Sequence, residues 1–184
     1  MAPNPPSSET MTRVSTEGVL PLSIFLRVHT DRPSASLAFV SDYYHALQTR
    51  RHAISTFYIP VPSGPGTKPT PTIVINGKAF QDGSAVQELF EKQLPPTRYE
   101  SQCVDCHVLN SNYIQEGQQN TRSPASTITL LVIVSGIVRF GEDRNNPERQ
   151  FSETLVLIPN IHLNPRHARA KEFLIQSQNF RIVV

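Results

Sequence analysis

Apolar residues in the segment 37–58 recur every three or four positions, which is the spacing of one face of a helix. A single helix over this segment would place Arg50 and Arg51 in the middle of its apolar face, where unpaired charges are costly. We therefore predict a turn near Gln48, followed by a short second helix that Thr49 caps.

The next segment combines two short β runs, at 72–75 and 78–80, with an intervening Asn76-Gly77 dipeptide. Asn-Gly is the pair that best fits a type I′ turn, so the pattern predicts a β-hairpin. Ser84 is then expected to cap a third helix, whose apolar stripe stops before two consecutive prolines at 95 and 96.

Four strands separated by polar loops are predicted in the rest of the chain, at 101–109, 127–140, 151–158 and 172–184. Because the helices come first and the strands afterwards, the predicted fold class is α+β. In the last strand the apolar parity changes between Ile175 and Phe180, which predicts a β-bulge near residues 177–179.

The segment 130–140 is apolar on both parities, whereas a strand with one solvent-exposed face alternates. We assign the even-numbered positions to the core, so that Leu131 and Ile133 point outward. These outward apolar side chains are expected to be covered from solvent by something else. The same alternation, with Phe151 and Phe180 facing inward, identifies outward residues on the two following strands. The predicted partner-interface residues are Leu131, Ile133, Ser135, Thr154, Val156, Asn179 and Arg181.

Arg181 is the charged member of this outward set. We predict that it lies among Ile133, Val156 and Asn179 and forms half of an interfacial ion pair, because its apolar neighbours are expected to be covered. A solvated arginine is the alternative that the same position allows.

Composition limits the classes of protein to which the chain can belong. Hydrophobic residues make up 38% of the 184 residues, but no apolar run approaches the ~20 residues of a membrane-spanning helix. Seventeen Lys and Arg against fifteen Asp and Glu give a net charge of +2, which does not favour a dedicated nucleic-acid binder. A basic run at 166–171 has no interleaved aromatic residues, so we expect RNA to bind at most weakly.

Residue types also divide the chain. Residues 1–18 are rich in Ser, Pro and Thr and are predicted to form a disordered tail. The segment 19–34 is apolar but contains Pro21 and Pro33, and the pattern assigns it no element. We expect one domain over residues 35–184. No secretory signal is visible, so the two cysteines are expected to be intracellular thiols.

Two groups of residues suggest chemistry. Cys103 and Cys106 form a C-x-x-C motif, but positions i and i+3 of a strand point to opposite faces, so we expect no shared metal ion. Asp105 and His107 share one face of that strand, and Tyr43 or Tyr44 could approach them to form an acid/base pocket. Hydrogen bonding at the sheet margin is the simpler interpretation of the second group.

Eight short segments carry a resemblance to a known family. They are Phe39-Val-Ser-Asp-Tyr-Tyr, Thr49-Arg-Arg, Phe57-Tyr, Val74-Ile-Asn-Gly, Glu88-Leu-Phe, Val104-Asp-Cys, Leu131-Val-Ile-Val-Ser-Gly-Ile-Val-Arg-Phe and Phe180-Arg. In this order they resemble the small subunit of the heterodimeric nuclear mRNA export receptor, within the nuclear transport factor 2-like family, and the match spans about 35–184. The resemblance implies a cone in which three helices pack against a bent antiparallel sheet.

The resemblance implies a binding protein without catalysis or cofactor. Its partner would be the large subunit, paired sheet against sheet, and the carboxylate opposite Arg181 would belong to that subunit. Such heterodimers carry messenger ribonucleoprotein through nuclear pores by contacting Phe-Gly repeat nucleoporins, so the expected location is the nucleus and nuclear pore, with shuttling to the cytoplasm and no membrane. Two alternatives remain: a pocket enzyme of the same fold, of the dehydratase or isomerase type, and a nuclear import carrier that acts as a homodimer.

Overall fold

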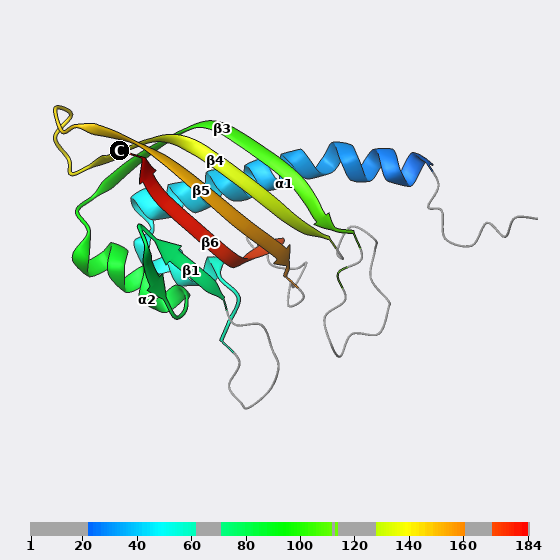
Figure 1. Ribbon diagram of the computed structural model, residues 1–184, viewed down its shortest axis with the longest axis horizontal. Helices are drawn as coiled ribbons and strands as arrows, with labels where there is room; N and C mark the ends of the chain where they lie inside the picture. The colour runs from blue at the N-terminus through cyan, green and yellow to red at the C-terminus, as the bar shows by residue number, and fades with distance from the viewer. Residues whose placement is uncertain (1–21, 62–70, 112, 114–127, 161–170, 184) are drawn as a thin grey trace, which may run out of the picture.

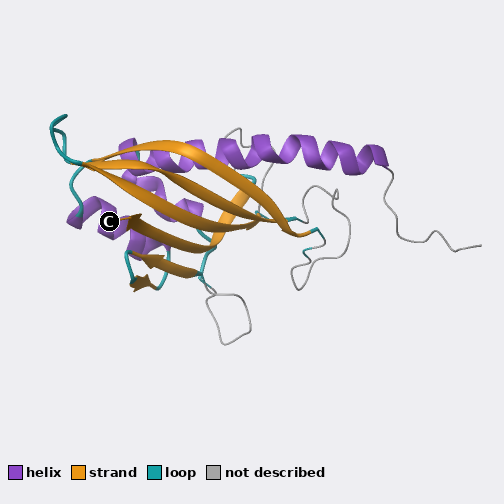
Figure 2. Ribbon diagram, turned by 45° about the horizontal axis from the view of Figure 1, so that its top comes forward, coloured by secondary structure: helices purple, strands orange, loops and turns teal. Residues whose placement is uncertain are grey.

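The computed structural model describes residues 22–61, 71–111, 113, 128–160 and 171–183. The predicted tail, residues 1–18, lies outside them. A curved sheet of long strands runs alongside the first helix (Figure 1), and the helices pack against one face of that sheet (Figure 2). None of the described helices is long and apolar enough to cross a membrane.

The first helix, α1, spans Leu22–Thr49, and a short 3₁₀ helix, η1, spans Arg51–Phe57. The helix therefore begins well before residue 37, where its apolar periodicity becomes visible, and it includes most of the unassigned segment 19–34. The helix ends before Arg50 and Arg51, as predicted, so these two charged residues do not lie on its apolar face.

The predicted cap at Thr49 is wrong. The Thr49 hydroxyl donates to the carbonyl oxygen of His45 at 2.8 Å, and η1 follows Arg50 without a side-chain cap. Thr49 is still the last residue of α1, where the carbonyl four residues earlier is the nearest acceptor.

Arg51 connects the end of α1 to the third helical segment. Its guanidinium donates to the backbone carbonyl oxygens of Phe90, Leu94 and Pro95. Carbonyls in the last turn of a helix and just after it lack partners within the helix, so one arginine satisfies three such acceptors at once.

The predicted hairpin is confirmed. Strands β1 (Thr72–Ile75) and β2 (Lys78–Phe80) are joined by Asn76 and Gly77, whose φ angles are 49° and 82°. Left-handed values at both central positions are those of a type I′ turn.

The third helical segment consists of α2 (Gly83–Glu88) and a π-helical continuation, η2 (Leu89–Gln93). Its cap is Asp82 and not Ser84, since the Asp82 carboxylate accepts a hydrogen bond from the Ala85 backbone N–H at 2.8 Å. Asp82 has the extended backbone that a cap residue requires, with a φ of −160°.

Four long strands complete the chain: β3 (Thr97–Asn110), β4 (Thr129–Phe140), β5 (Glu148–Pro159) and β6 (Phe173–Val183). The strand order is β2-β1-β6-β5-β4-β3, and every pair is antiparallel except β1 with β6. The predicted bent antiparallel sheet is therefore confirmed, with this one parallel pair added. The bulge lies at Gln176, one residue before the predicted position.

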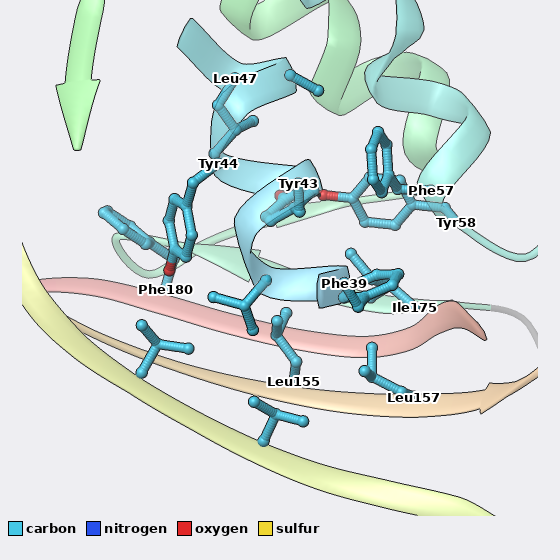
Figure 3. Close-up of a cluster of buried hydrophobic side chains, with 14 of the residues drawn as sticks. Phe39, Tyr43, Tyr44, Leu47, Phe57, Tyr58, Leu155, Leu157, Ile175 and Phe180 are labelled. Carbon is cyan, nitrogen blue, oxygen red and sulfur yellow. Dashed lines mark hydrogen bonds between the residues drawn. The ribbon is translucent and has the colours of Figure 1, made fainter. Parts of the chain in front are cut away.

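The core lies between the helices and the inner face of the sheet. Tyr43 and Tyr44 extend from α1 toward the strands, and Leu155 and Leu157 of β5 point back toward them (Figure 3). The even-numbered residues of β4 from Leu130 to Val138 are buried, as the parity predicts, whereas Phe140, which was assigned to the core with them, is half-buried.

Candidate functional site

The seven predicted interface residues all lie on the outer face of the sheet, which we define as the face opposite the helices. The strand register places them in three neighbouring cross-strand rows. The rows are Leu131–Val156–Ser177, Ile133–Thr154–Asn179 and Ser135–Ser152–Arg181. Each predicted residue is half-buried or exposed, as expected for side chains that point away from the core.

Apolar side chains follow β4 and β5 across the outer face. Ile133 is 37% exposed, and Leu131, Ile137 and Val156 are half-buried. Leu131 lies directly opposite Val156 and Ile133 follows it on β4, while Ser135 separates this group from Ile137; we call the four side chains the apolar stripe. Strand residues with apolar side chains on both faces are typical of a sheet that is covered on both faces.

The expected surroundings of Arg181 need correction. The register sets Arg181 opposite Ser152, while Asn179 is its neighbour two residues earlier on β6. Ile133 and Val156 belong to other rows. The difference is one of position along the strands, because Ile133 lies one row from Arg181 and Val156 lies two rows from it, opposite Ser177. Arg181 is exposed, and its nearest outward neighbour across the strand is a hydroxyl.

The acid/base pocket suggested by the sequence does not form. Asp105 and His107 do share one face of β3, opposite Ile133 and Leu131, but this is the outer face and both are exposed. Tyr43 and Tyr44 are buried on the inner side. The sheet itself therefore separates the two pairs of side chains.

The two cysteines also lie on opposite faces of β3. Cys103 pairs with the outward Ser135 and is exposed, whereas Cys106 pairs with the buried Val132. In the part of the chain that the structure describes, no group of three or more His, Cys, Asp and Glu side chains could hold a metal ion.

A buried polar cluster on the inner face was not predicted. It consists of Tyr43, Tyr44, Tyr58, Glu153 and Gln178, which we call the Glu153 cluster. Glu153 is 1% exposed and accepts hydrogen bonds from the Tyr44 hydroxyl and, at 2.5 Å, from the Gln178 amide. The sequence does hold a signal for it, because Glu153 has the same strand parity as the inward residues Phe151 and Leu155.

Burial controls the protonation of this cluster. Loss of hydration raises the pKa of Glu153 to about 7, and the hydrogen bonds from Tyr44 and Gln178 partly oppose that rise. Burial also raises the pKa of Tyr43 and of Tyr44 well above the usual value for tyrosine. The tyrosines therefore remain neutral donors, and Glu153 is the group that can change charge near neutral pH.

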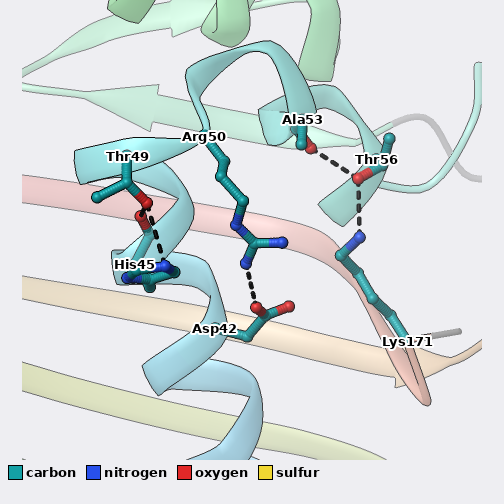
Figure 4. A network of polar contacts seen from close by, with 7 residues as sticks. All are labelled: Asp42, His45, Thr49, Arg50, Ala53, Thr56 and Lys171. Atoms are coloured by element: carbon teal, nitrogen blue, oxygen red, sulfur yellow. Dashed lines mark hydrogen bonds and ion pairs between the residues drawn. The ribbon is translucent and has the colours of Figure 1, made fainter. Parts of the chain in front are cut away.

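A groove of about 770 Å³ lies outside the core, beside α1 and the start of β6. Asp42, His45, Arg50 and Lys171 are among its lining residues, and Figure 4 shows Arg50 paired with Asp42. The Lys171 amine donates to the Thr56 hydroxyl at 2.8 Å. Lys171 is the one described member of the basic run at 166–171, and its amine is held against the protein.

The chain is similar to known proteins in sequence and in fold. No family model matches the chain. NTF2-related export protein 2 of Mus musculus is 24% identical over 137 residues, which cover 74% of this chain and 80% of that protein. A chain in the structure of the Chaetomium thermophilum Mex67 NTF2-like domain complexed with Mtr2 superposes with a TM-score of 0.68, at 22% identity, over 83% of this chain and 99% of that one.

The chain has the nuclear transport factor 2-like fold. The resemblance to the export-receptor small subunit, found from short segments, is confirmed by the similarity to NTF2-related export protein 2. The same fold also occurs in a putative scytalone dehydratase from Novosphingobium aromaticivorans, with a TM-score of 0.58 at 6% identity over 86% of this chain and 89% of that one. The nuclear transport factor 2-like fold alone therefore does not separate transport from catalysis.

Proposed function

We propose that this chain is the small, non-enzymatic subunit of a heterodimeric mRNA export receptor. It pairs with the nuclear transport factor 2-like domain of a large subunit through the outer face of its sheet. The observation that carries this proposal is the apolar stripe formed by Leu131, Ile133, Ile137 and Val156 on a face that the described helices leave open. The similarity to NTF2-related export protein 2 and to the Mex67:Mtr2 structure supports it.

The interface consists of the seven outward residues predicted from the sequence, within the domain 35–184. Arg181 meets a carboxylate of the large subunit there, at the polar margin of the apolar stripe. Its hydroxyl and amide neighbours, Ser152 and Asn179, can hydrogen-bond with the partner beside that ion pair. An interface with an apolar centre and a polar rim is the common arrangement in protein complexes.

The further parts of the function follow from the heterodimer. The complex contacts Phe-Gly repeat nucleoporins, passes through the nuclear pore and shuttles to the cytoplasm, while the small subunit itself binds RNA at most weakly. The net charge of +2 and the tethering of Lys171 against the protein support the weak contribution to RNA binding.

The interior supports a non-enzymatic role. Glu153 is the carboxylate at the centre of the fold, and it is bonded to Tyr44 and Gln178 rather than directed at open space. Tyr43 and Tyr58 are hydrogen-bonded to each other at 2.8 Å and also to Gln178. A substrate would have to displace these protein groups to reach the carboxylate.

Co-purification tests the proposal. The full chain is co-expressed with the Mex67-like large subunit of the same organism, and the complex is measured by size-exclusion chromatography with light scattering. We expect one copy of each chain. Ile133→Glu should abolish the complex, while the control Val61→Glu, which changes an exposed apolar residue away from the sheet face, should preserve it. A chain that forms a homodimer and does not bind the large subunit would instead indicate the import carrier.

A further inference from the structure

The sequence of the second half of β6 only weakly determines how this strand is aligned with β5. Residues 176–179 are four consecutive polar residues, and the first of them, Gln176, is the bulge. Hydrophobic alternation normally fixes which residues of a strand face the core, and it is missing over these four positions and resumes only at Phe180 and Ile182. A slip by one residue would turn Asn179 and Arg181 inward and would turn Phe180 out of the core.

Gln178 supplies the missing specification through hydrogen bonds. Its side chain is buried, and its amide group donates to the Glu153 carboxylate at 2.5 Å and to the Tyr43 hydroxyl at 2.8 Å. Its carbonyl oxygen accepts from the Tyr58 hydroxyl at 2.6 Å. One residue of β6 is thus bonded at once to β5, to α1 and to the residue that follows η1.

No neighbouring residue of β6 can replace Gln178. A slip would bring Ser177 or Asn179 to the inward position, and both side chains are shorter. Glu153 and Tyr58 would then lose hydrogen-bond partners inside the core, which is strongly unfavourable for buried polar groups. Only the slipped register loses these hydrogen bonds, so the Glu153 cluster stabilises the observed register relative to the slipped one.

The same residues stand directly behind the candidate interface. Glu153 lies between Ser152 and Thr154 on β5, and Gln178 lies between Ser177 and Asn179 on β6. Because side chains alternate along a strand, fixing the inward residue fixes both outward neighbours.

We propose that Glu153 and Gln178 are positioning residues whose hydrogen bonds fix the register of β6 and thereby present Asn179 and Arg181 on the outer face. That the presented residues meet a large subunit rests on the proposed function. The register itself is a property of the isolated chain and is tested on it.

The register is measured by NMR on the full chain, from cross-strand nuclear Overhauser contacts that show which β6 residue lies opposite Thr154. Wild type should show Asn179 alone. Gln178→Ser removes the hydrogen bonds without adding an apolar group, and it should produce a second set of contacts from a shifted register. Glu153→Gln keeps an amide partner for Gln178 and should retain the single register.

Leu155→Ala is the matched control, because Leu155 lies directly opposite Gln178 and is equally buried. It weakens the core at the same place and should leave the register single. If Gln178→Ser does not fold, Gln178→Asn, which is one methylene shorter, is measured in the same way and should also show two registers. A single unchanged register in the variant that folds would overturn the proposal.

Affinity for the large subunit separates this proposal from the proposed function. Gln178→Ser should weaken the complex at least about tenfold, and Leu155→Ala less than about threefold, since only the first changes the presented residues. If wild type does not bind the large subunit, the proposed function fails and the register data still decide the role of Gln178. If wild type binds and Gln178→Ser binds equally well, the positioning role fails alone.

Discussion

Replacing Glu153 by glutamine should change how the stability of the protein depends on pH. Burial raises the pKa of Glu153 to about 7 in the folded protein, against 4.5 for an ordinary glutamate. The folded state therefore holds this proton more tightly than the unfolded state does. The contribution of Glu153 to stability is greatest below pH 4.5, declines as the pH rises from 4.5 to about 7, and is constant above that.

The size of the effect follows from the same shift. A difference of about 2.5 pKa units corresponds to about 3 kcal/mol of unfolding free energy, at about 1.4 kcal/mol per unit. Glutamine cannot ionise, and it keeps an acceptor for the Tyr44 hydroxyl and for the Gln178 amide. The glutamine variant should thus gain about 3 kcal/mol over wild type between pH 4.5 and pH 8.

Urea unfolding at several pH values measures this difference. Subtracting wild type from Glu153→Gln at each pH cancels the titration of all other carboxylates. Glu142→Gln, which changes an exposed glutamate, is the control for replacing a carboxylate outside the core. A flat difference for Glu153→Gln, or one that favours wild type as the pH rises, would refute the assignment of a raised pKa to this buried carboxylate.

Three further changes have defined outcomes. Arg181→Glu should weaken the heterodimer by about 3–5 kcal/mol in calorimetric titration while the isolated chain keeps its melting temperature, and an Asp→Arg change at the opposing position of the large subunit should partly restore binding. Arg51→Met should lower the unfolding free energy by about 2–3 kcal/mol in urea, because four backbone carbonyls lose a charged donor. Gly136→Ala should cost about 1–3 kcal/mol in the same assay, since its Cβ would lie 2.1 Å from the Glu100 carbonyl oxygen, with Ser135→Ala as a neutral neighbour.

Strand parity is the property that the sequence predicts well. On β4 both parities are apolar, but the polar residues Ser135 and Arg139 share the odd parity, so the inward and outward sets still follow from the local pattern. The start of α1 could not be found in this way, because Pro21 and Pro33 interrupt the segment and apolar periodicity appears only from Leu37 onward. Helix starts depend on packing as well as on local sequence.

The Glu153 cluster shows a different limit of sequence reasoning. Its members are far apart in the chain, with Tyr44 and Glu153 separated by 109 positions and Tyr58 and Gln178 by 120. From the sequence alone, a single glutamate is expected to lie at the surface, since buried carboxylates are rare unless they are paired. Parity places Glu153 among the inward residues of β5, but only the long-range contacts explain why a carboxylate is tolerated in the core.

The aromatic residues around this cluster connect the interior to the proposed role of the outer face. The Tyr44 ring centroid lies 5.1 Å from that of Tyr99 and 5.7 Å from that of Phe151, and Phe151 stacks on Phe180 at 5.4 Å. Rings at these distances are in contact, so they fill the space between α1 and the strands beside Glu153. These ring contacts beside Glu153 support the proposal that the chain binds a partner through the outer face of its sheet and not a substrate inside the fold. There the apolar stripe and Arg181 are the features that a second protein can bind.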